Sequence, residues 1–492
     1  MQLILALDQG TTGTTAALVD AKTFKFIDKV NLEYPQIYPK PGWVEHNLND
    51  IWNSVEATVK KVLTKANASA NDIVAIGITN QRETTCAFDR SGKPLANAIV
   101  WQDRRTSDFC RENKSHEPKL RSQTGLPLDP YFSATKMRWL LQNVDAVKNA
   151  AKKGDLCFGT IDTFLLYKLT AVHATEGSNA SRTLVYDLHK LKFEESLLEF
   201  FSLPQDALPQ VLPSFGEFGK TKGLGFLPDG IPVTGILGDQ QSALFGQAGH
   251  SKGALKCTYG TGAFMLLNTG TSAVNSDNGL LTTIAYQDKS GAHYALEGSC
   301  YIAGAAVQWL RDNLKIISSS PEVEMLAKQI GSLEEMEHVM FLPFFTGIGS
   351  PHWAPEAKAA IVGMTRDTSA AHLARACLEG IALSINDLVN AMSADTKLKV
   401  ESMRVDGGAA ANDLLLEMQA TFGGMKVIRP KVIETTAYGA AFAAGIGIGA
   451  VDLAGIDKLW EEDRVFSPIS STVAYCQKKA SLWQQTIKRL YL

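Results

Sequence analysis

The sequence predicts a duplicated α/β protein of two or more domains, with a ligand-binding cleft at the ends of its strands. Its 492 residues exceed what a single hydrophobic core organises. Several apolar runs of strand length end in charged or polar side chains, which is typical of the clefts of α/β proteins. A Gly/Thr-rich hairpin of the first half returns in the second half, and chance turns need not recur in matching context.

Composition and charge exclude several classes of protein. Apolar residues make up 45% of the chain and charged residues 20%, which is ordinary for a soluble globular protein. The formal net charge of −3 gives no broad electrostatic footprint for nucleic acid or a membrane surface. The seven Cys include no CxxC pair, which indicates reduced thiols in the cytosol rather than a disulfide framework. We therefore expect a cytoplasmic protein with no nucleic-acid partner.

The chain shows no export or membrane signal. The N-terminus lacks a basic region and its apolar run stops at Asp8, so we expect no signal peptide. The longest uncharged segment, Ala437–Val451, is too short to span a bilayer and contains four glycines. We expect no integral membrane segment, and we interpret this stretch as a buried element that packs closely through small residues.

The first hairpin is the element around which the chain is organised. An apolar strand, Leu3–Leu7, is followed by Asp8, a loop over Gly10–Thr15 and a return strand, Ala16–Val19. Glycines let an anion approach the backbone, and N–H groups and Thr hydroxyls can bind one phosphate. Asp8 beside that phosphate could hold Mg²⁺ through water. An ordinary hairpin turn fits equally well, and the loop is neither a Walker loop nor GxGxxG.

The next strand ends in a charged pair. Asn49 or Asp50 could cap a helix whose apolar residues run at helical spacing from Ile51 to Val62. Ile73–Thr79 then forms a strand that leads into the adjacent Arg82 and Glu83. Such a pair can be a surface salt bridge of little energetic worth. At the rim of a cleft, its guanidinium and carboxylate could instead bind the hydroxyls of a small polyol.

Two aromatic residues are further candidates for the same site. Ala98–Gln102 is a short apolar strand, and its Trp101 could belong to the core or form an apolar wall against a ligand. Tyr131 precedes a helix that carries Met137 and Trp139. Its hydroxyl could contact a ligand, or its ring could simply pack on that helix.

A third strand end carries a second carboxylate. Ile231–Leu237 is a strand interrupted by Gly235, Asp239 follows it, and Gln241–Gly246 opens a helix. A lone Asp in this position is usually a helix cap. Together with Asp8, however, it suits phosphoryl transfer, in which one carboxylate binds the metal and another accepts a proton from the attacking hydroxyl.

The second half repeats the opening pattern. Leu255–Asn268 is again a strand, a Gly/Thr loop and a strand, and its Gly260, Thr261 and Gly262 echo the first hairpin. Two phosphate-type hairpins, one in each half, predict a nucleotide held between two copies of a domain. Later, a strand ends at Asp406 before two glycines and a helix from about Asn412. Those glycines could admit a base, ribose or phosphate, or could serve only a tight connection.

These stretches together resemble the FGGY carbohydrate kinase family. The resemblance covers Ile4 to about Gly449, and NQRETT with TYGTGAF is most similar to the glycerol-phosphorylating members; the matching stretches are DQGTT, NQRETT, AIVWQDRR, YFSATK, GDQQSALFGQ, YGTGAF and DGGAAAN. It implies two actin-like (ribonuclease H-like) domains that flank a nucleotide/substrate cleft. Residues 1–245 would hold the glycerol site and the first phosphate loop. Residues 246–492 would hold the second phosphate loop and the adenosine site.

The resemblance also implies an activity and its partners. The chain would use ATP and Mg²⁺ to phosphorylate a terminal hydroxyl of glycerol, giving sn-glycerol 3-phosphate in glycerol catabolism, and would form a homo-oligomer, a dimer or a tetramer. Asp239 would be the general base and would share the metal with Asp8. The glycerol site would consist of Arg82, Glu83, Trp101, Tyr131, Asp239, Gln240 and Phe264. The nucleotide would be bound by Thr11, Thr12, Gly13, Thr261, Gly304, Gln308, Gly408 and Asn412.

One departure and two alternatives remain. Many relatives have an Arg where this chain has Thr15, near the phosphates. A sugar kinase for a ketose or gluconate would need a larger pocket, and Arg82, Glu83 and Trp101 argue against it. A non-kinase relative of actin or of the Hsp70 ATPases would share the two hairpins but lack Asp239 and the polyol cluster. ATP turnover with and without glycerol distinguishes these possibilities.

Overall fold

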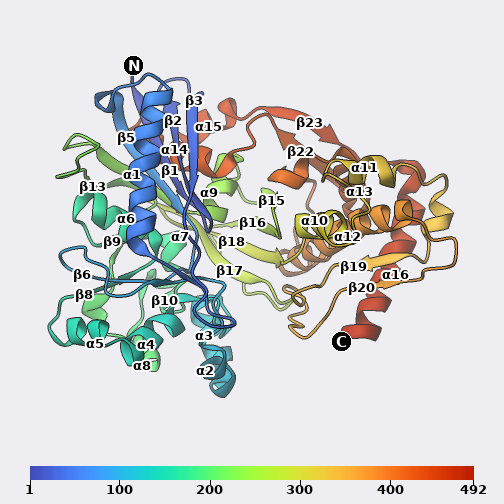
Figure 1. Cartoon of the computed structure of the whole chain (residues 1–492), viewed down its shortest axis with the longest axis horizontal. Helices are drawn as coiled ribbons and strands as arrows, with labels where there is room; N and C mark the ends of the chain where they lie inside the picture. Colours follow the sequence, from blue (N-terminus) through green and yellow to red (C-terminus); the bar gives the residue numbers. More distant parts are fainter.

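The computed structural model describes residues 1–492, and two β-sheets form the centres of its two halves (Figure 1). The first sheet has six strands in the order β13-β14-β5-β1-β2-β3. These are β1 Leu3–Gln9, β2 Gly13–Asp20, β3 Phe26–Glu33, β5 Ile73–Asn80, β13 Phe215–Lys220 and β14 Pro232–Gly238. The second has seven, in the order β17-β18-β16-β15-β21-β22-β23. They are β15 Leu255–Tyr259, β16 Ala263–Gly270, β17 Leu281–Asp288, β18 Gly291–Cys300, β21 Ser402–Asp406, β22 Lys426–Pro430 and β23 Glu462–Phe466.

The remaining elements are helices and short two-stranded pairs. The helices are α1 Leu48–Lys65, α2 Ser107–Glu112, α3 Glu117–Thr124, α4 Ser133–Asn143, α5 Asp145–Lys152, α6 Ile161–Thr170, α7 Gly177–Ala180, α8 Glu195–Phe201, α9 Asp239–Gly246, α10 Gly304–Asp312, α11 Glu322–Ala327, α12 Ala370–Thr396, α13 Asp413–Gly423, α14 Thr435–Gly447, α15 Leu453–Leu459 and α16 Val473–Tyr491. The short strands are β4 Glu45–His46, β6 Cys86–Asp89, β7 Ala98–Ile99, β8 Leu156–Gly159, β9 Ala174–Glu176, β10 Tyr186–Asp187, β11 Lys192–Phe193, β12 Gln210–Leu212, β19 Met340–Leu342 and β20 Ala360–Val362. None of the helices combines the length and apolar character needed to cross a bilayer.

The two sheets repeat one topology, which confirms the predicted duplication. In each sheet an antiparallel hairpin, β1–β2 or β15–β16, is flanked on its second strand by an antiparallel third strand, β3 or β18. Its first strand pairs in parallel with β5 or β21, which in turn pairs in parallel with β14 or β22. The first strand of each hairpin is thus central to its sheet, and each Gly/Thr loop lies at the carboxyl end of that central strand.

Local predictions were corrected at four places. Helix α1 begins at Leu48 and is capped by Asn47, whose side chain accepts from the Asn49 N–H, so the predicted caps at Asn49 or Asp50 were wrong. The strand predicted over Ala98–Gln102 ends at Ile99, because β7 pairs only with the two residues of β4 and, in an isolated bridge, with Thr85. Gly235 does not interrupt β14 and causes only a shift in register, and α9 opens at once with Asp239 rather than at Gln241.

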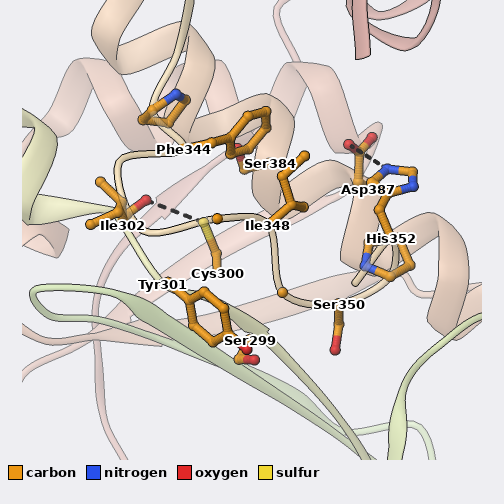
Figure 2. A pocket seen from close by; sticks show the side chains of 14 residues that line it. Ser299, Cys300, Tyr301, Ile302, Phe344, Ile348, Ser350, His352, Ser384 and Asp387 are labelled. Carbon is orange, nitrogen blue, oxygen red and sulfur yellow. Dashed lines mark hydrogen bonds and ion pairs between the residues drawn. The ribbon is translucent and has the colours of Figure 1, made fainter. Parts of the chain in front are cut away.

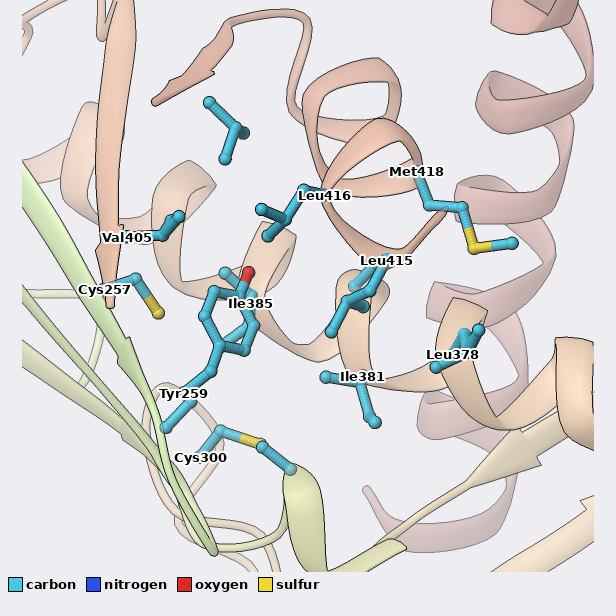
Figure 3. Close-up of a cluster of buried hydrophobic side chains, with 14 of the residues drawn as sticks. Cys257, Tyr259, Cys300, Leu378, Ile381, Ile385, Val405, Leu415, Leu416 and Met418 are labelled. Atoms are coloured by element: carbon cyan, nitrogen blue, oxygen red, sulfur yellow. The ribbon is translucent and has the colours of Figure 1, made fainter. Parts of the chain in front are cut away.

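The core of the second half positions one wall of a cavity described below. Helices α12 and α13 cover strands β15 and β21, and their side chains interdigitate in one large hydrophobic cluster (Figure 3). Tyr259 lies fully buried at the end of β15, and its hydroxyl donates to Gln419 Oε1 on α13 over 2.9 Å. This bond ties the strand that precedes the second Gly/Thr loop to the helix that follows Asn412.

Helix α14 contains most of the uncharged segment and lies against the first sheet, although it comes late in the chain (Figure 1). The expectation of close packing through small residues is confirmed. A Cβ on Gly77 of β5 would lie 2.1 Å from the Ala440 carbonyl oxygen, and one on Gly439 would lie 1.9 Å from the Ser242 carbonyl oxygen of α9. Glycines on both the helix and the sheet therefore let α14 and α9 lie against the strands that carry Asp8 and Asp239.

We expect Gly77→Ala to destabilise the protein by about 1–3 kcal/mol, because the added methyl group meets backbone atoms that must shift. Urea unfolding of wild type and variant measures this change. Gly225→Ala is the matched control, since a Cβ at Gly225 meets nothing within 4 Å. Equal stability of the two variants would contradict the close approach of α14.

Candidate active site

Three neighbouring parallel strands end at one edge of the first sheet and bring the predicted catalytic residues together. Gln9 at the end of β1 is in register with Asn80 of β5, and Asn80 with Gly238 of β14. Asp8 therefore lies at the same level as the strand end that leads into Arg82 and Glu83, and Asp239 follows Gly238 directly. Ligands of α/β proteins bind at such carboxyl edges.

Arg82 is a buried link between this edge and the second sheet. Its Nε lies 3.0 Å from Asp239 Oδ1, and its two terminal nitrogens bind the two carboxylate oxygens of Glu297 over 2.6 and 2.9 Å. Nη1 also donates to Gln241 Oε1 over 3.2 Å. Glu297 belongs to β18, so a residue of the second sheet holds a guanidinium at the carboxyl edge of the first.

Glu83 is held by a second buried arginine. Arg182 Nε donates to Glu83 Oε1 over 2.6 Å, and Arg182 Nη2 donates to Glu297 Oε1 over 3.2 Å. Glu83 has a φ of 60°, an uncommon conformation for a non-glycine residue. The Ser133 hydroxyl, which donates to the Glu83 carbonyl oxygen over 3.0 Å, helps to hold it. Backbone strain of this kind clusters at functional sites.

The charges of this site shift the pKa values of its carboxyl groups. Burial alone would raise the pKa of Glu297, but Arg182 and Arg82 outweigh it and hold that pKa at about 2. Burial, and then the charge of Asp239, raise the pKa of Asp8 to about 7. Burial also raises the pKa of Asp239, and the Arg82 guanidinium opposes this effect. The two carboxylates at the edge therefore influence each other, whereas Glu297 is a fixed anion.

Trp101 and Tyr131 form an aromatic wall beside Glu83. Their rings meet edge to face with centroids 5.6 Å apart, and the Trp101 indole N–H donates to the Thr11 hydroxyl over 3.0 Å. The Arg182 guanidinium lies over the Tyr131 ring at 5.8 Å. Lys136, fully buried, donates to the Tyr131 carbonyl oxygen over 2.6 Å and so fixes the loop that carries this wall. The wall thus joins the predicted polyol residues to the first Gly/Thr loop.

A buried polar network supports the first Gly/Thr loop from behind. The Tyr34 hydroxyl lies 2.6 Å from the Gly10 carbonyl oxygen and 2.8 Å from that of Thr11. Gln81 Nε2 lies 3.1 Å from the Tyr34 hydroxyl and 3.3 Å from His46 Nδ1. His46 Nε2 lies 2.8 Å from Gln36 Oε1, and burial lowers the pKa of His46 to about 4. The imidazole is therefore neutral, with Nε2–H as donor and Nδ1 as acceptor.

A cavity of about 430 Å³ lies in the second half, next to the second Gly/Thr loop. Its lining includes five of the eight predicted nucleotide residues, Thr261, Gly304, Gln308, Gly408 and Asn412. The others, Thr11, Thr12 and Gly13, belong to the first hairpin and do not line this cavity.

The two hairpins have the same kind of turn hydrogen bond: the Gly10 N–H donates to the Gly13 carbonyl oxygen, and the Gly260 N–H donates to the Gly262 carbonyl oxygen. The Thr15 hydroxyl accepts from Asn31 Nδ2 over 2.9 Å.

The structure adds Arg182, Glu297 and Lys256, which were not among the predicted site residues. Each is fully buried, and a buried charge requires a partner. A local sequence signal could have indicated Glu297, because it is the one charged residue in the apolar run that ends β18. Phe264, predicted to flank the substrate, lies on β16 opposite Thr258 of β15, whose hydroxyl is 2.8 Å from Lys256 Nζ.

A second cavity, of about 20 Å³, contains none of the predicted site residues. Ser299, Ser350 and Ser384 line it, with His352 beside Asp387 (Figure 2). The Ser350 hydroxyl is buried and has no hydrogen-bond partner within the chain. A polar cavity of this size suits one buried water.

Fold and site together define a kinase of the actin-like class, with one carboxylate-bearing edge and one nucleotide-sized cavity. The chain belongs to the FGGY family of carbohydrate kinases: the family's N-terminal domain matches residues 3–246 and its C-terminal domain matches residues 255–448. Proteins named glycerol kinase from Bdellovibrio bacteriovorus and Myxococcus xanthus are each 48% identical over 99% of this chain and 99% of their own length.

Solved structures agree with this assignment. Plasmodium falciparum glycerol kinase with ADP matches with a TM-score of 0.92 at 35% identity, covering 100% of this chain and 99% of the other. Xylulose kinase from Lactobacillus acidophilus matches with a TM-score of 0.89 at 21% identity, covering 100% of this chain and 98% of the other, and shows the fold alone.

The neutral, buried His46 predicts acid sensitivity. Its pKa is about 4 in the folded protein and about 6.5 in the unfolded chain, so between these values the unfolded chain binds the extra proton. The free energy of unfolding should therefore fall by about 1–3 kcal/mol as the pH drops from 6.5 towards 4.

His46→Gln, which cannot titrate, should lose this component of the pH dependence. Urea unfolding of both proteins at several pH values measures it. Parallel pH profiles for wild type and variant would contradict the assignment.

Proposed function

We propose that this chain transfers the γ-phosphoryl group of ATP to a terminal hydroxyl of glycerol, giving sn-glycerol 3-phosphate in glycerol catabolism. The observation that carries the proposal is the joint placement of Arg82, Glu83 and the Trp101–Tyr131 wall beside Asp239. Charged groups next to an aromatic wall suit a short polyol, which offers hydroxyls on its edges and C–H groups between them. The similarity to proteins named glycerol kinase supports the same substrate.

Free polar atoms indicate how the substrate would be held. Arg182 occupies Glu83 Oε1, while Glu83 Oε2 and the Tyr131 hydroxyl have no hydrogen-bond partner within the chain. A carboxylate oxygen accepts and a phenol can donate, so together they can bind two hydroxyls of one small molecule. Arg82 would add a donor, and Trp101 and Phe264 would flank the carbons. Gln240 would donate to another substrate oxygen.

Asp239 has the geometry of a general base. Arg82 Nε lies 3.0 Å from Oδ1 in an ion pair, and the Gln240 N–H donates to the same oxygen over 2.6 Å. Oδ2 is left free on a side chain that is 30% exposed. One oxygen thus orients the carboxylate and the other can accept the proton of the attacking hydroxyl. Removing that proton makes a poor alcohol nucleophile effective.

The carboxylates at the edge fit Mg²⁺. The structure contains no cluster of three or more His, Cys, Asp or Glu side chains that could hold a metal by themselves. Mg²⁺ in kinases is commonly bound by one or two carboxylates together with water and substrate phosphates, which is the donor set that Asp8 and Asp239 provide. Bound there, the ion would neutralise phosphate charge.

ATP would lie between the two hairpins. The cavity next to Thr261 would hold the adenosine, with Gly304, Gln308, Gly408 and Asn412 around it, and the triphosphate would reach towards Thr11, Thr12 and Gly13. We propose a division into residues 1–245, with the glycerol site, and residues 246–492, with the adenosine site. Assembly as a dimer or tetramer and a cytoplasmic location remain predictions from the sequence.

A substrate panel tests the proposal. ADP release is measured with glycerol, dihydroxyacetone, xylulose, gluconate and no acceptor. We expect kcat/KM to be highest for glycerol and turnover without acceptor to be low. Preference for xylulose or gluconate would favour another sugar kinase, and acceptor-independent turnover would favour a non-kinase ATPase; either result would overturn the proposal.

In the same assay Asp239→Asn should lower kcat for glycerol by about 10²–10⁴-fold, the usual worth of a positioned base. Asp108→Asn is the control, because Asp108 is a surface residue with a side chain that is 77% exposed. If raised Mg²⁺ restores most of the rate of Asp239→Asn, the residue serves the metal rather than the proton.

A further inference from the structure

Lys256 is a buried cation for which the proposed mechanism has no role yet. It lies on β15 in the second half, and none of its surface is exposed. Its ammonium donates to Gln240 Oε1 over 2.6 Å and to the Thr258 hydroxyl over 2.8 Å. Gln240 belongs to α9 in the first half and is the direct neighbour of Asp239. The Lys256–Gln240 bond therefore crosses between the halves at the catalytic edge.

An ammonium can only donate, and this decides how the Gln240 amide is oriented. The atom that faces Lys256 must be the acceptor Oε1, so the NH₂ group must point away from it. No group of the chain accepts a hydrogen bond from Gln240 Nε2, and the side chain is only half-buried. The lysine thus leaves Gln240 with two unused N–H donors beside Asp239.

We infer that Lys256 is a positioning residue that makes Gln240 an obligate hydrogen-bond donor to an oxygen of the polyol substrate. This inference rests on the proposed function, because it names the partner of the Gln240 amide as a glycerol hydroxyl. Without the cation, the amide can rotate and present Oε1 to the substrate, and its donors are no longer held in place. The Thr258 hydroxyl, which accepts from the same ammonium, likewise keeps its own proton free to donate.

Gln240→Glu is the decisive variant. It preserves the shape of the side chain and gives Lys256 an ion-pair partner, but it replaces the outward N–H donors with an acceptor. Lys256→Met removes the cation itself. We expect each variant to raise the KM for glycerol about 10-fold, as for the loss of one hydrogen bond that leaves its partner unpaired, and to leave the KM for ATP within about twofold.

The double variant Lys256→Met/Gln240→Ala distinguishes action through Gln240 from an independent role. If Lys256 acts through Gln240, the double variant should be no worse than Gln240→Ala alone, because the group being positioned is already gone. Lys256→Arg should recover part of the glycerol affinity. Lys479→Met is the matched control: Lys479 is equally buried, donates to the Val339 carbonyl oxygen over 2.7 Å, and should not affect the KM for glycerol.

Steady-state kinetics of the folded variants measures the KM for glycerol and the KM for ATP. An unchanged KM for glycerol in Gln240→Glu, or independent losses that multiply in the double variant, would overturn the inference. If Lys256→Met does not fold, Gln240→Glu alone decides. Absence of glycerol phosphorylation by the wild type would instead refute the proposed function, so the two failures are distinguishable.

Discussion

The buried ion network of Arg82, Arg182, Glu83 and Glu297 is the interaction on which the site depends. Each of these side chains is nearly or fully buried, and each positive group has a carboxylate within 3.2 Å. An unpaired buried charge costs about 3–5 kcal/mol, so every member requires the others. Because Glu297 comes from the second sheet and the other three from the first half, the network joins the halves where the substrate would bind.

The two copies of the topology supply different parts of the proposed site. The first sheet supplies the carboxylates Asp8 and Asp239 at the ends of β1 and β14, on either side of β5, and the second supplies the cavity proposed to hold the nucleotide. Two side-chain cross-links connect the two halves: Glu297 binds Arg82, and Lys256 binds Gln240. Arg82 is itself proposed to bind the substrate, and Gln240 is the direct neighbour of Asp239, the proposed general base. Both cross-links therefore end at the proposed site. The relative placement of the halves is therefore built into the electrostatics of the site.

Much of this arrangement could be predicted from local sequence patterns. Apolar runs located the central strands, and the recurring Gly/Thr loop predicted the duplicated topology, because these signals lie within a few residues of one another. Long-range partners could not be predicted in this way. Nothing local to Glu297 names Arg82 as its partner, and nothing in the 437–451 segment names the first sheet. Element ends failed for a related reason: β7 stops at Ile99 because its partner strand β4 is short, and Asn47 rather than Asn49 caps α1 because its side chain reaches the free N–H of Asn49.

A charge from the second sheet, that of Glu297, holds the proposed polyol-binding groups of the first half. Calorimetric titration of glycerol into Glu297→Gln, with ADP titrated separately as a check on the nucleotide cavity, tests this claim most directly. The substitution keeps the shape of Glu297 but removes the charge that holds Arg82 and Arg182. We predict a Kd for glycerol at least about 10-fold weaker than that of the wild type, as for a hydrogen bond to a charged group, and an ADP affinity close to that of the wild type. An unchanged Kd for glycerol in a folded variant would contradict it.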